Sequence, residues 1–313
     1  MTKKHKILII KLGYSETLIS DIGSNCSLGD VFRTTAVLHL FKDDHVTWLT
    51  DAAAVPLLEG NPYIDRILVF DLLTLLQLEG ERFDKVINLE KVPGICAFVK
   101  KISAWSHFGF RLDQETGRAE AYELAYEALA VATLENKKKL NNKPWVEVLY
   151  QMLGATWRGE SFVLGYQPQT KPGFDIGFNM HVGSLLPLKA WPTHYWDELA
   201  GLAQGRYSVT YQQSLNNLAG YMDWINSCRL LITSDTLGLY LGVALGKQVL
   251  GLFGPTMGSE QSPHPNLRIL YPALDRPCIP CFQKQCEHND PCMGHITPQQ
   301  VLAAIDGWGI AKA

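Results

Sequence analysis

The sequence lacks the uninterrupted run of about 18 apolar residues that a membrane-spanning helix needs. Its most apolar stretch, residues 237–253, is broken by glycines and by Lys247. It also lacks a basic excess, because 28 lysines and arginines stand against 31 aspartates and glutamates, for a formal net charge of −3. A basic excess is the usual mark of a nucleic-acid-binding protein. We therefore expect neither a membrane span nor a nucleic-acid partner.

The N-terminus lacks the features of a secretory signal. Its apolar run, residues 7–10, is too short for a signal-peptide core and has the character of a buried first strand. The seven cysteines are an odd number, which argues against a secreted disulfide framework in a chain without such a signal. These observations predict a cytoplasmic protein.

Two common nucleotide-binding motifs are missing. No Gly-x-Gly-x-x-Gly follows the first predicted strand. No Walker loop is present either, since Gly246-Lys247 is followed by Gln248 rather than by serine or threonine. Their absence argues against a nicotinamide-dependent dehydrogenase and against a P-loop NTPase.

The sequence does contain a regular alternation of short apolar runs and helical patterns. With 313 residues, 47% hydrophobic and 19% charged, the chain is large enough for two α/β domains. Such alternation is typical of parallel βαβ units. In the first half we predict strands at 6–11, 45–49, 66–70 and 84–89, and helices at 31–41, 72–78, 95–103, 117–134 and 144–153.

The alternation restarts after a looser segment at residues 160–173. There we predict strands at 174–179, 207–211, 230–233, 248–253 and 267–271, and helices at 193–203, 218–226, 237–245 and 298–305. The chain is thus predicted to form two Rossmann-like domains, at residues 1–165 and 166–313, facing each other across a cleft. Open parallel sheets bind ligands beyond the carboxyl ends of their strands, so the cleft is the expected site.

Asp30 is the first candidate for chemistry. It ends the motif Ser27-Leu28-Gly29-Asp30, at the start of a predicted helix that also carries Arg33. A carboxylate at this place is suited to taking a proton from an acceptor hydroxyl. The alternative is that Asp30 only caps the helix, since aspartate is favoured at the N-cap.

Two further segments follow predicted strands of the second half. Ser234-Asp235-Thr236, continued by Leu237-Gly238, opens a predicted helix, where free N–H groups and the helix dipole attract phosphate. Gly254-Pro255-Thr256 forms a tight turn after the next strand, where loops line nucleotide sites. The alternatives are an ordinary N-cap and an ordinary turn.

Lys189 precedes a predicted helix in Lys189-Ala190-Trp191-Pro192. Its ammonium group is suited to neutralising a diphosphate leaving group. The alternative is a solvated surface lysine. Trp191 either stacks on a base or packs.

Four of the cysteines crowd into residues 278–292. Their spacing, Cys278-x2-Cys281-x4-Cys286-x5-Cys292, suits a tetrahedral thiolate site for zinc or a single iron, with His288 and His295 as substitute ligands. We interpret this site as structural, because no open coordination position is implied. The alternative is four reduced thiols or labile disulfides.

In this order the motifs resemble those of glycosyltransferase family 9, the ADP-heptose:lipopolysaccharide heptosyltransferases. The resemblance is carried by residues 7–13, 27–31, 47–51, 58–66, 189–192, 234–236 and 252–256. The cysteine segment, ending in Cys292-Met293 with a downstream Ile-Thr-Pro, also occurs in some members. Each motif is weak alone, but their joint order is specific.

The resemblance implies a GT-B fold, with the acceptor on the N-terminal domain and a nucleotide-sugar donor on the C-terminal domain. It implies inverting transfer of heptose from ADP-heptose to a hydroxyl of the lipopolysaccharide core, without a cofactor for catalysis. The partners would be this donor and a lipid-linked or saccharide acceptor, with peripheral contact at the inner membrane.

By position, the resemblance also assigns roles to the candidate residues. Asp30 is similar to the family's catalytic base, beside the acceptor loop that contains Ser27, Gly29 and Arg33. The residues implied to bind the donor are Lys189, Asp235, Thr236, Leu237, Gly238, Gly254, Pro255 and Thr256. We expect Asp30→Asn to fold, to bind donor and to lose transfer.

Some positions depart from the family pattern. Residues 14–26 are inserted before Ser27, and we interpret them as shaping acceptor choice or acting as a lid. The family's Asp-Thr-Gly is Asp235-Thr236-Leu237 here, with Gly238 one place later, and Tyr240 stands where a histidine is often found. These departures leave open a non-catalytic nucleotide-sugar-binding relative or a sugar-nucleotide epimerase.

Overall fold

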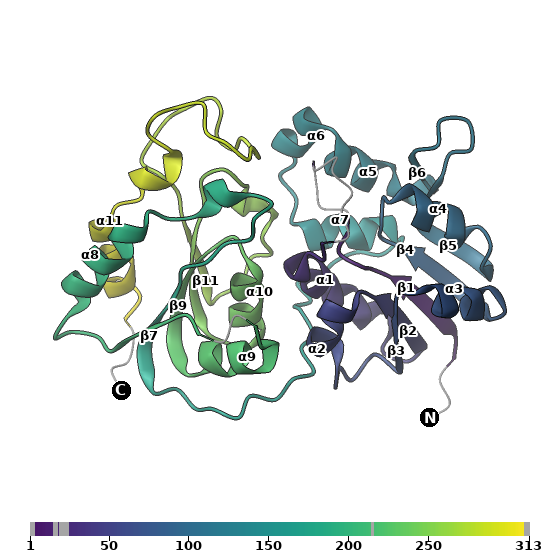
Figure 1. The fold of residues 1–313 in the computed structure, drawn as a ribbon, viewed down its shortest axis with the longest axis horizontal. Helices are drawn as coiled ribbons and strands as arrows, with labels where there is room; N and C mark the ends of the chain where they lie inside the picture. Colours follow the sequence, from purple (N-terminus) through teal and green to yellow (C-terminus); the bar gives the residue numbers. More distant parts are fainter. Residues whose placement is uncertain (1–3, 15–17, 19–24, 214–215, 310–313) are drawn as a thin grey trace. The chain divides into compact units, whose positions relative to one another are not determined.

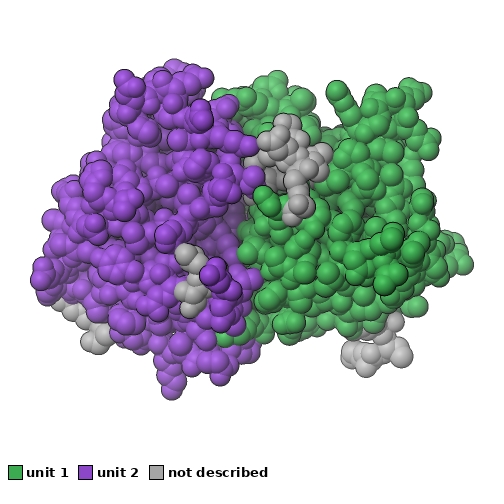
Figure 2. Space-filling model, viewed as in Figure 1, with its two compact units in different colours: residues 1–166 green, residues 167–313 purple. Residues whose placement is uncertain are grey.

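The computed structural model describes residues 4–14, 18, 25–213 and 216–309 (Figure 1). The chain divides into two compact units, Met1–Tyr166 and Gln167–Ala313 (Figure 2). The division falls inside the looser segment at residues 160–173. Among the described helices, none has both the length and the apolar character that crossing a membrane requires.

The N-terminal unit is built on a six-stranded sheet in the order β3-β2-β1-β4-β5-β6. Its strands are β1 (Lys6–Ile10), β2 (His45–Thr50), β3 (Arg66–Val69), β4 (Arg82–Asn88), β5 (Ser103–Leu112) and β6 (Ala119–Ala121). Strands β1 to β5 run parallel, and β6 pairs antiparallel with β5. The parallel pairing of the first four strands agrees with the alternation in the sequence.

Strand β1 lies inside this sheet because it is apolar on both faces. Ile7 and Ile9 pack into one hydrophobic cluster, whereas Leu8 and Ile10 pack into another. All four side chains are fully buried. Alternate side chains of a strand point to opposite faces, so helices must cover both faces of the sheet.

The helices and 3-10 turns of this unit are α1 (Leu28–Thr34), η1 (Thr35–Phe41), η2 (Ala52–Ala54), α2 (Val55–Leu58), α3 (Leu72–Glu79), α4 (Pro93–Val99), η3 (Glu123–Ala125), α5 (Tyr126–Thr133), α6 (Glu135–Leu140) and α7 (Trp145–Met152).

The region after β4 differs from the prediction. The helix predicted at 95–103 ends at Val99, and β5 begins at Ser103. The helix predicted at 117–134 begins only with α5, because Ala119–Ala121 pairs with β5 as β6. The period-two pattern of Phe108, Phe110 and Leu112 was the available signal for β5. The polar stretch at 136–143 contains α6, a mostly exposed helix whose charged side chains hide its helical pattern.

The C-terminal unit is built on a five-stranded sheet in the order β11-β10-β9-β7-β8. All its strand pairs are parallel. The strands are β7 (Phe174–Asn179), β8 (Val209–Tyr211), β9 (Cys228–Ser234), β10 (Gln248–Leu252) and β11 (Leu267–Leu270). The helices and 3-10 turns are η4 (Pro187–Lys189), α8 (Thr193–Ala203), α9 (Leu218–Asn226), α10 (Leu237–Ala244), η5 (Gly258–Glu260), η6 (Cys292–His295) and α11 (Pro298–Asp306).

Each sheet contains one point where the strand order reverses. In the N-terminal unit it lies between β1 and β4, and in the C-terminal unit it lies between β7 and β9. Loops leave a reversal point in opposite directions and open a crevice at the carboxyl ends of the two strands. Lys11 and Glu90 follow β1 and β4, while Asn179 and Ser234 end β7 and β9. The topology therefore marks these positions, one set in each unit, as ligand sites.

Candidate active site

Asp30 is the third residue of α1, and the N-cap of this helix is Ser27. The interpretation of Asp30 as a mere N-cap is therefore wrong. Its side chain is buried, with 8% of its surface exposed. One carboxylate oxygen, Oδ1, accepts hydrogen bonds from Nε and Nη2 of Arg33, at 2.9 and 2.6 Å. The other oxygen, Oδ2, contacts the ammonium group of Lys11.

Lys11 is shared between two carboxylates. It follows β1, is 3% exposed, and its Nζ lies 3.2 Å from Oε1 of Glu90 as well as against Asp30. Glu90 is fully buried, and its Oε1 also accepts hydrogen bonds from the backbone N–H groups of Leu12 and Gly13, at 2.8 and 2.7 Å. The β1/β4 reversal point thus holds a buried cluster of alternating charges.

The cluster fixes the protonation of its members. Burial alone would raise the pKa of Asp30, but Lys11 and Arg33 outweigh it and hold that pKa well below its usual range. Burial likewise opposes the charge of Lys11, but Asp30 and Glu90 outweigh it and raise its pKa. At neutral pH Asp30 is therefore a carboxylate and Lys11 an ammonium group.

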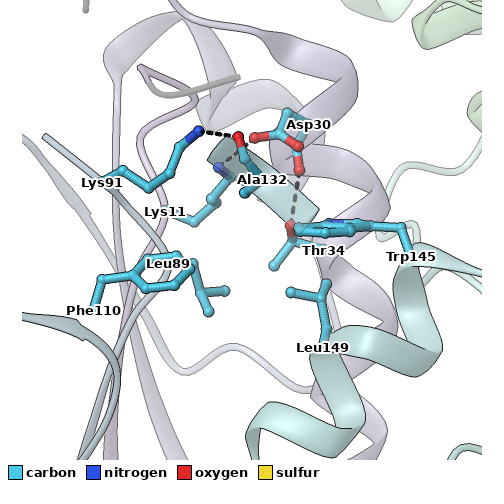
Figure 3. A pocket seen from close by; sticks show the side chains of 9 residues that line it. All are labelled: Lys11, Asp30, Thr34, Leu89, Lys91, Phe110, Ala132, Trp145 and Leu149. Carbon is cyan, nitrogen blue, oxygen red and sulfur yellow. Dashed lines mark hydrogen bonds and ion pairs between the residues drawn. The ribbon is translucent and has the colours of Figure 1, made fainter. Parts of the chain in front are cut away.

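A pocket in the N-terminal unit opens beside Asp30 (Figure 3). Its lining residues are Lys11, Asp30, Thr34, Leu89, Lys91, Phe110, Ala132, Trp145 and Leu149. Lys91 donates a hydrogen bond to the carbonyl oxygen of Ala132 at 3.0 Å. Burial, and then the charge of Lys11, lower the pKa of Lys91 to about 8. An ionised carboxylate beside apolar walls suits a ligand that presents a hydroxyl group.

The other N-terminal candidates lie around Asp30. The N–H of Ser27 donates to the carbonyl oxygen of Gly13 at 2.8 Å, which ties the start of α1 to the end of β1. Gly29 lies in the first turn of α1. Besides pairing with Asp30, the guanidinium of Arg33 lies 5.3 Å from the ring centroid of Trp145. Most of the insert at 14–26 lies outside the described residues.

The second candidate group lies at the β7/β9 reversal point. Thr236 is the N-cap residue of α10, but its side chain makes no capping hydrogen bond. Instead, Nδ2 of Asn179 donates to the hydroxyl oxygens of Thr233 and Thr236, at 2.7 and 3.0 Å. The hydroxyl of Tyr221 donates to Oδ1 of Asn179 at 2.8 Å. This network holds Thr236 in place beside the first N–H groups of the helix.

Gly238 is required by the same network. A Cβ at this position would come within 2.5 Å of Nδ2 of Asn179 and 2.6 Å of the hydroxyl of Tyr221. The glycine that stands one place later than in the family pattern therefore has a packing reason here. Leu237, which stands where the family's Asp-Thr-Gly motif has its glycine, is the first residue of α10.

Asp235 is held by Tyr240, the residue that stands where the family often has a histidine. Its Oδ1 accepts a hydrogen bond from the hydroxyl of Tyr240 at 3.2 Å, and Nε2 of Gln261 lies 3.5 Å away. Two nearby hydroxyl groups, those of Ser234 and Thr256, are buried without a hydrogen-bond partner among the described residues. Such groups cost about 1–3 kcal/mol each when left unsatisfied. Polar atoms of a ligand would relieve this cost.

Lys189 is the remaining candidate of the C-terminal unit. Lys189 ends η4, is half-buried, and its side chain forms no hydrogen bond or ion pair within the described part of the chain. Trp191 is 2% exposed, and its indole N–H donates to the carbonyl oxygen of Ile296 at 2.8 Å. Of the two interpretations of Trp191, packing is the correct one.

The structure does not show the expected metal site within the described residues. All seven cysteines are free, and the described residues contain no group of three or more His, Cys, Asp or Glu side chains that is arranged to hold a metal. Sγ of Cys278 lies 3.7 Å from Nε2 of His288. Cys292 packs in the core, where a Cβ at Gly254 would come within 2.7 Å of its Sγ. Burial raises the pKa of Cys292 to about 11, which keeps it a neutral thiol.

Four residues that hold the two candidate groups in place were not singled out from the sequence: Lys11, Glu90, Asn179 and Tyr221. Lys11, Glu90 and Asn179 shared one signal, a polar side chain directly after or at the end of a buried strand. Tyr221 lies inside α9, and no local pattern distinguishes it from a core tyrosine. Only the sheet topology brings each set together.

Removing the Asp30 carboxylate should cost stability, which qualifies the expectation that Asp30→Asn folds normally. The substitution leaves Lys11 and Arg33 without one counter-charge in a buried place, and breaking such a pair costs about 3–5 kcal/mol. The pKa of Asp30 is lower in the folded than in the unfolded protein. The stability that its carboxylate contributes is therefore fully present above about pH 4, and below that it falls by about 1.4 kcal/mol for each pH unit. Urea denaturation at pH 7 and pH 3 measures both effects.

The control is Glu81→Gln, which breaks the half-exposed pair of Arg66 and Glu81 in the same unit. That change should cost about 1 kcal/mol or less. Equal stabilities of Asp30→Asn and Glu81→Gln at pH 7 would contradict the prediction.

Comparisons with known proteins concern both units. Residues 215–290, which include the Ser234-Asp235-Thr236 and Gly254-Pro255-Thr256 segments, match the family model of glycosyltransferase family 9 (heptosyltransferase). A lipooligosaccharide heptosyltransferase 2 of Campylobacter jejuni serotype O:6 is 32% identical over 79 residues, which are 25% of this chain and 25% of that protein. The chain thus aligns with about a quarter of the length of the curated relatives that it matches.

Solved structures extend the likeness over nearly the whole chain. The E. coli heptosyltransferase WaaC, determined with ADP-2-deoxy-2-fluoro heptose, has a TM-score of 0.61 at 13% identity, covering 97% of this chain and 100% of that one. The iron-containing dodecameric glycosyltransferase TibC of enterotoxigenic E. coli has a TM-score of 0.60 at 12% identity, covering 98% of this chain and 76% of that one. These structures confirm the predicted GT-B fold. Together with the family-model match over residues 215–290, they support the resemblance to glycosyltransferase family 9.

Proposed function

We propose that this protein is an inverting glycosyltransferase that moves heptose from ADP-heptose to a hydroxyl group of the lipopolysaccharide core. One observation carries the proposal: a buried, ionised carboxylate, Asp30, lines a pocket at the β1/β4 reversal point. The family match over residues 215–290 supports a nucleotide-sugar donor in the C-terminal unit. The names of the matched relatives support heptose as the sugar.

In this mechanism Asp30 accepts the proton of the acceptor hydroxyl as its oxygen attacks the anomeric carbon of the donor. The transition state resembles an oxocarbenium ion, as in other glycosyl transfer. The departing diphosphate is stabilised by the ammonium group of Lys189 and by the backbone N–H groups at the start of α10, around Thr236 and Leu237, whereas Asp235 is proposed to bind a ribose or sugar hydroxyl. The ammonium and N–H groups supply positive charge to the leaving group, so we propose no cofactor for the chemical step.

The donor subsite is proposed to include Gly238 and the turn Gly254-Pro255-Thr256. The hydroxyls of Ser234 and Thr256 lie buried on neighbouring loops, after β9 and β10, without partners among the described residues. A diphosphate or ribose oxygen would satisfy them. The hydrogen bonds from Asn179 leave the α10 amide groups available to the same ligand.

Nucleotide binding tests this proposal first. ADP and ADP-heptose should stabilise the protein against unfolding more than UDP or GDP sugars do. At a ligand concentration of 100 times the dissociation constant, the free energy of unfolding should rise by about 2.7 kcal/mol over that of the free protein. Transfer to a lipopolysaccharide-core acceptor should then depend on Asp30. A selective response to UDP or GDP would discard the proposed donor, and no response to any of them would discard the transferase.

Thr256→Val should weaken ADP binding about tenfold, which corresponds to the loss of one hydrogen bond to a charged ligand. It should not reduce the stability of the free protein, because the hydroxyl has no partner among the described residues. Thr50→Val is the matched control, since Thr50 also has a buried hydroxyl without such a partner but lies in the N-terminal unit. Isothermal titration of both variants measures the difference; equal affinities would remove Thr256 from the donor subsite.

The two alternative functions predict other outcomes. A non-catalytic nucleotide-sugar-binding relative would bind ADP-heptose but transfer nothing to any acceptor. A sugar-nucleotide epimerase would convert the donor in the absence of acceptor. The buried carboxylate beside a pocket favours transfer over pure binding, because keeping a charge buried is costly without a use for it.

We further propose that the protein acts at the cytoplasmic face of the inner membrane, where a lipid-linked acceptor resides. Helix α3 exposes three leucines, Leu72 at 70%, Leu73 at 77% and Leu76 at 57%. Arg82 begins β4, three residues after the end of α3, and its guanidinium lies 5.2 Å from the ring centroid of Trp105 in β5, which is 76% exposed. Helices that lie on anionic membranes typically insert leucine side chains into the lipid and carry tryptophan and basic side chains beside them.

The α3 leucines are also linked to the candidate active site. The ring of Tyr14, which directly follows Gly13, packs edge-on against Phe70 with centroids 6.0 Å apart. Phe70 immediately precedes Asp71, the N-cap of α3. A membrane contact through α3 would therefore hold the Gly13 loop, and with it Asp30, close to a lipid-linked acceptor.

The triple variant Leu72→Ser/Leu73→Ser/Leu76→Ser should bind vesicles of phosphatidylglycerol and phosphatidylethanolamine at least about tenfold more weakly, because it loses apolar area that enters the membrane. Transfer to a water-soluble core fragment should not change. Leu140→Ser is the control, because Leu140 is 79% exposed at the end of α6 in the same unit. Sedimentation with vesicles provides the measurement, and unchanged binding by the triple variant would exclude α3.

A structural zinc or iron in the cysteine segment is a separate proposal. The titration of Cys292 responds to the charges of Cys278, Cys281 and Cys286, so the four sulfurs share one region of the C-terminal unit. The name of the related TibC supports iron. Elemental analysis of protein purified under reducing conditions should find about one metal per chain. Protein without zinc and without iron would leave four reduced thiols.

A further inference from the structure

Glu90 is linked to Asp30 by two routes. The first is the ammonium group of Lys11, which contacts both carboxylates. The second is the backbone: Glu90 accepts the N–H of Gly13, the carbonyl of Gly13 accepts the N–H of Ser27, and the carbonyl of Ser27 accepts the N–H of Asp30. The position and the charge of Asp30 therefore both depend on a side chain that comes from the neighbouring strand end.

Gly13 makes the backbone route possible. Its φ is +81°, and a Cβ there would lie 2.9 Å from both N and O of Ser27. Only glycine combines this conformation with such a close approach. The end of β1 can thus approach the start of α1 closely, although residues 14–26 separate them along the chain.

The charge route raises a chemical difficulty for the proposed base. Lys11 and Arg33 both stabilise the carboxylate form of Asp30, which makes it a poor proton acceptor. A general base works best when its proton affinity suits the proton that it must take. Something must weaken the hold of Lys11 on Asp30 during transfer, and Glu90, 3.2 Å from the same ammonium group, is placed to do so.

We propose that Glu90 is a positioning residue that shares the Lys11 ammonium with Asp30 and takes it over when Asp30 accepts the proton of the acceptor. This inference rests on the proposed function. In the step, the acceptor O–H bond breaks and its proton goes to a carboxylate oxygen of Asp30. The acceptor oxygen bonds to the anomeric carbon, whose bond to the diphosphate oxygen breaks, and the nucleoside diphosphate leaves with that electron pair.

The charges around Asp30 support this assignment. Before transfer, Lys11 and Arg33 face Asp30 and Glu90, so the four charges cancel. After transfer Asp30 is neutral, and Glu90 remains to balance Lys11. Without Glu90, two cations would face a neutral acid in a buried place, which is unfavourable. Other titratable groups around the cluster include Lys91, whose pKa burial and Lys11 lower to about 8, and Cys26, whose pKa burial raises to about 12. They also include Tyr14, whose pKa is raised by burial and by its hydrogen bond to Asp51, and Lys138, whose charge acts on Lys91.

Glu90→Gln should lower kcat by about 10- to 100-fold, the range expected when a general base loses part of its proton affinity. The KM values for donor and acceptor should stay within about threefold, because Glu90 acts through Lys11 and contacts no substrate. Glu81→Gln, which removes a carboxylate from an ion pair elsewhere in the N-terminal unit, should leave kcat unchanged. A folded Glu90→Gln protein with the kcat of the wild type would overturn the proposal.

Rescue separates this role from a merely structural one. The double variant Lys11→Met/Glu90→Gln removes the cation together with its counter-charge, so the proton affinity of Asp30 rises again. Its kcat should exceed that of Glu90→Gln, and the acid limb of its pH–rate profile should move to higher pH than in the wild type. Urea denaturation checks that all variants are folded. A double variant no faster than the single one would contradict the charge-sharing role.

The effect of Glu90 on Asp30 can also be measured without substrate, so that it is tested separately from the proposed transferase activity. In Lys11→Met, the Asp30 carboxyl group should titrate at higher pH than in the wild type, followed by carbon-13 NMR and assigned with Asp30→Asn. Adding Glu90→Gln should move that titration back to lower pH, since a nearby negative charge is removed. Identical titrations in the two variants would show that Glu90 does not act on Asp30. Failure of the wild type to transfer any sugar would instead reject the proposed function.

Discussion

The N-terminal site depends on one buried ammonium group. Lys11 lies between the carboxylates of Asp30 and Glu90 at the place where the strand order reverses. A lone charge would be too costly to bury there, but alternating charges with satisfied hydrogen bonds are tolerated. This constraint explains why Glu90 also binds the backbone of Leu12 and Gly13, and why α1 begins directly beneath it. The same cluster fixes the charge of the residue proposed as the base.

The C-terminal unit uses neutral groups at the equivalent place in its sheet. Asn179 ends β7 and joins Tyr221 to Thr233 and Thr236 by hydrogen bonds, without any buried ion pair among these four. A neutral network leaves the positive end of the α10 dipole uncancelled, which suits an anionic ligand. The two units thus present opposite electrostatic characters, a fixed carboxylate in one and unsatisfied donors in the other. That contrast is what an acceptor hydroxyl and a diphosphate leaving group respectively require.

The departures from the family pattern acquire physical reasons in the structure. Gly238 is needed because Asn179 and Tyr221 pack where its side chain would be. Tyr240 donates to Asp235 and so substitutes a neutral hydrogen bond for the usual histidine. The cysteine segment packs against Gly254, so Cys292 supports the turn proposed to contact the donor whether or not a metal is bound nearby.

The sequence by itself determined the fold class. Strands such as β1, apolar on both faces, require helices on both sides of a parallel sheet. The joint order of weak motifs indicated a resemblance to glycosyltransferase family 9, whose model matches residues 215–290. It did not determine β5, whose alternation is diluted by polar residues, or the polar helix α6. Nor did it reveal Glu90 or Asn179, because their importance comes from partners 79 and 57 positions away, Lys11 and Thr236. Strand order brings those partners together, and strand order is a property of tertiary packing rather than of local sequence.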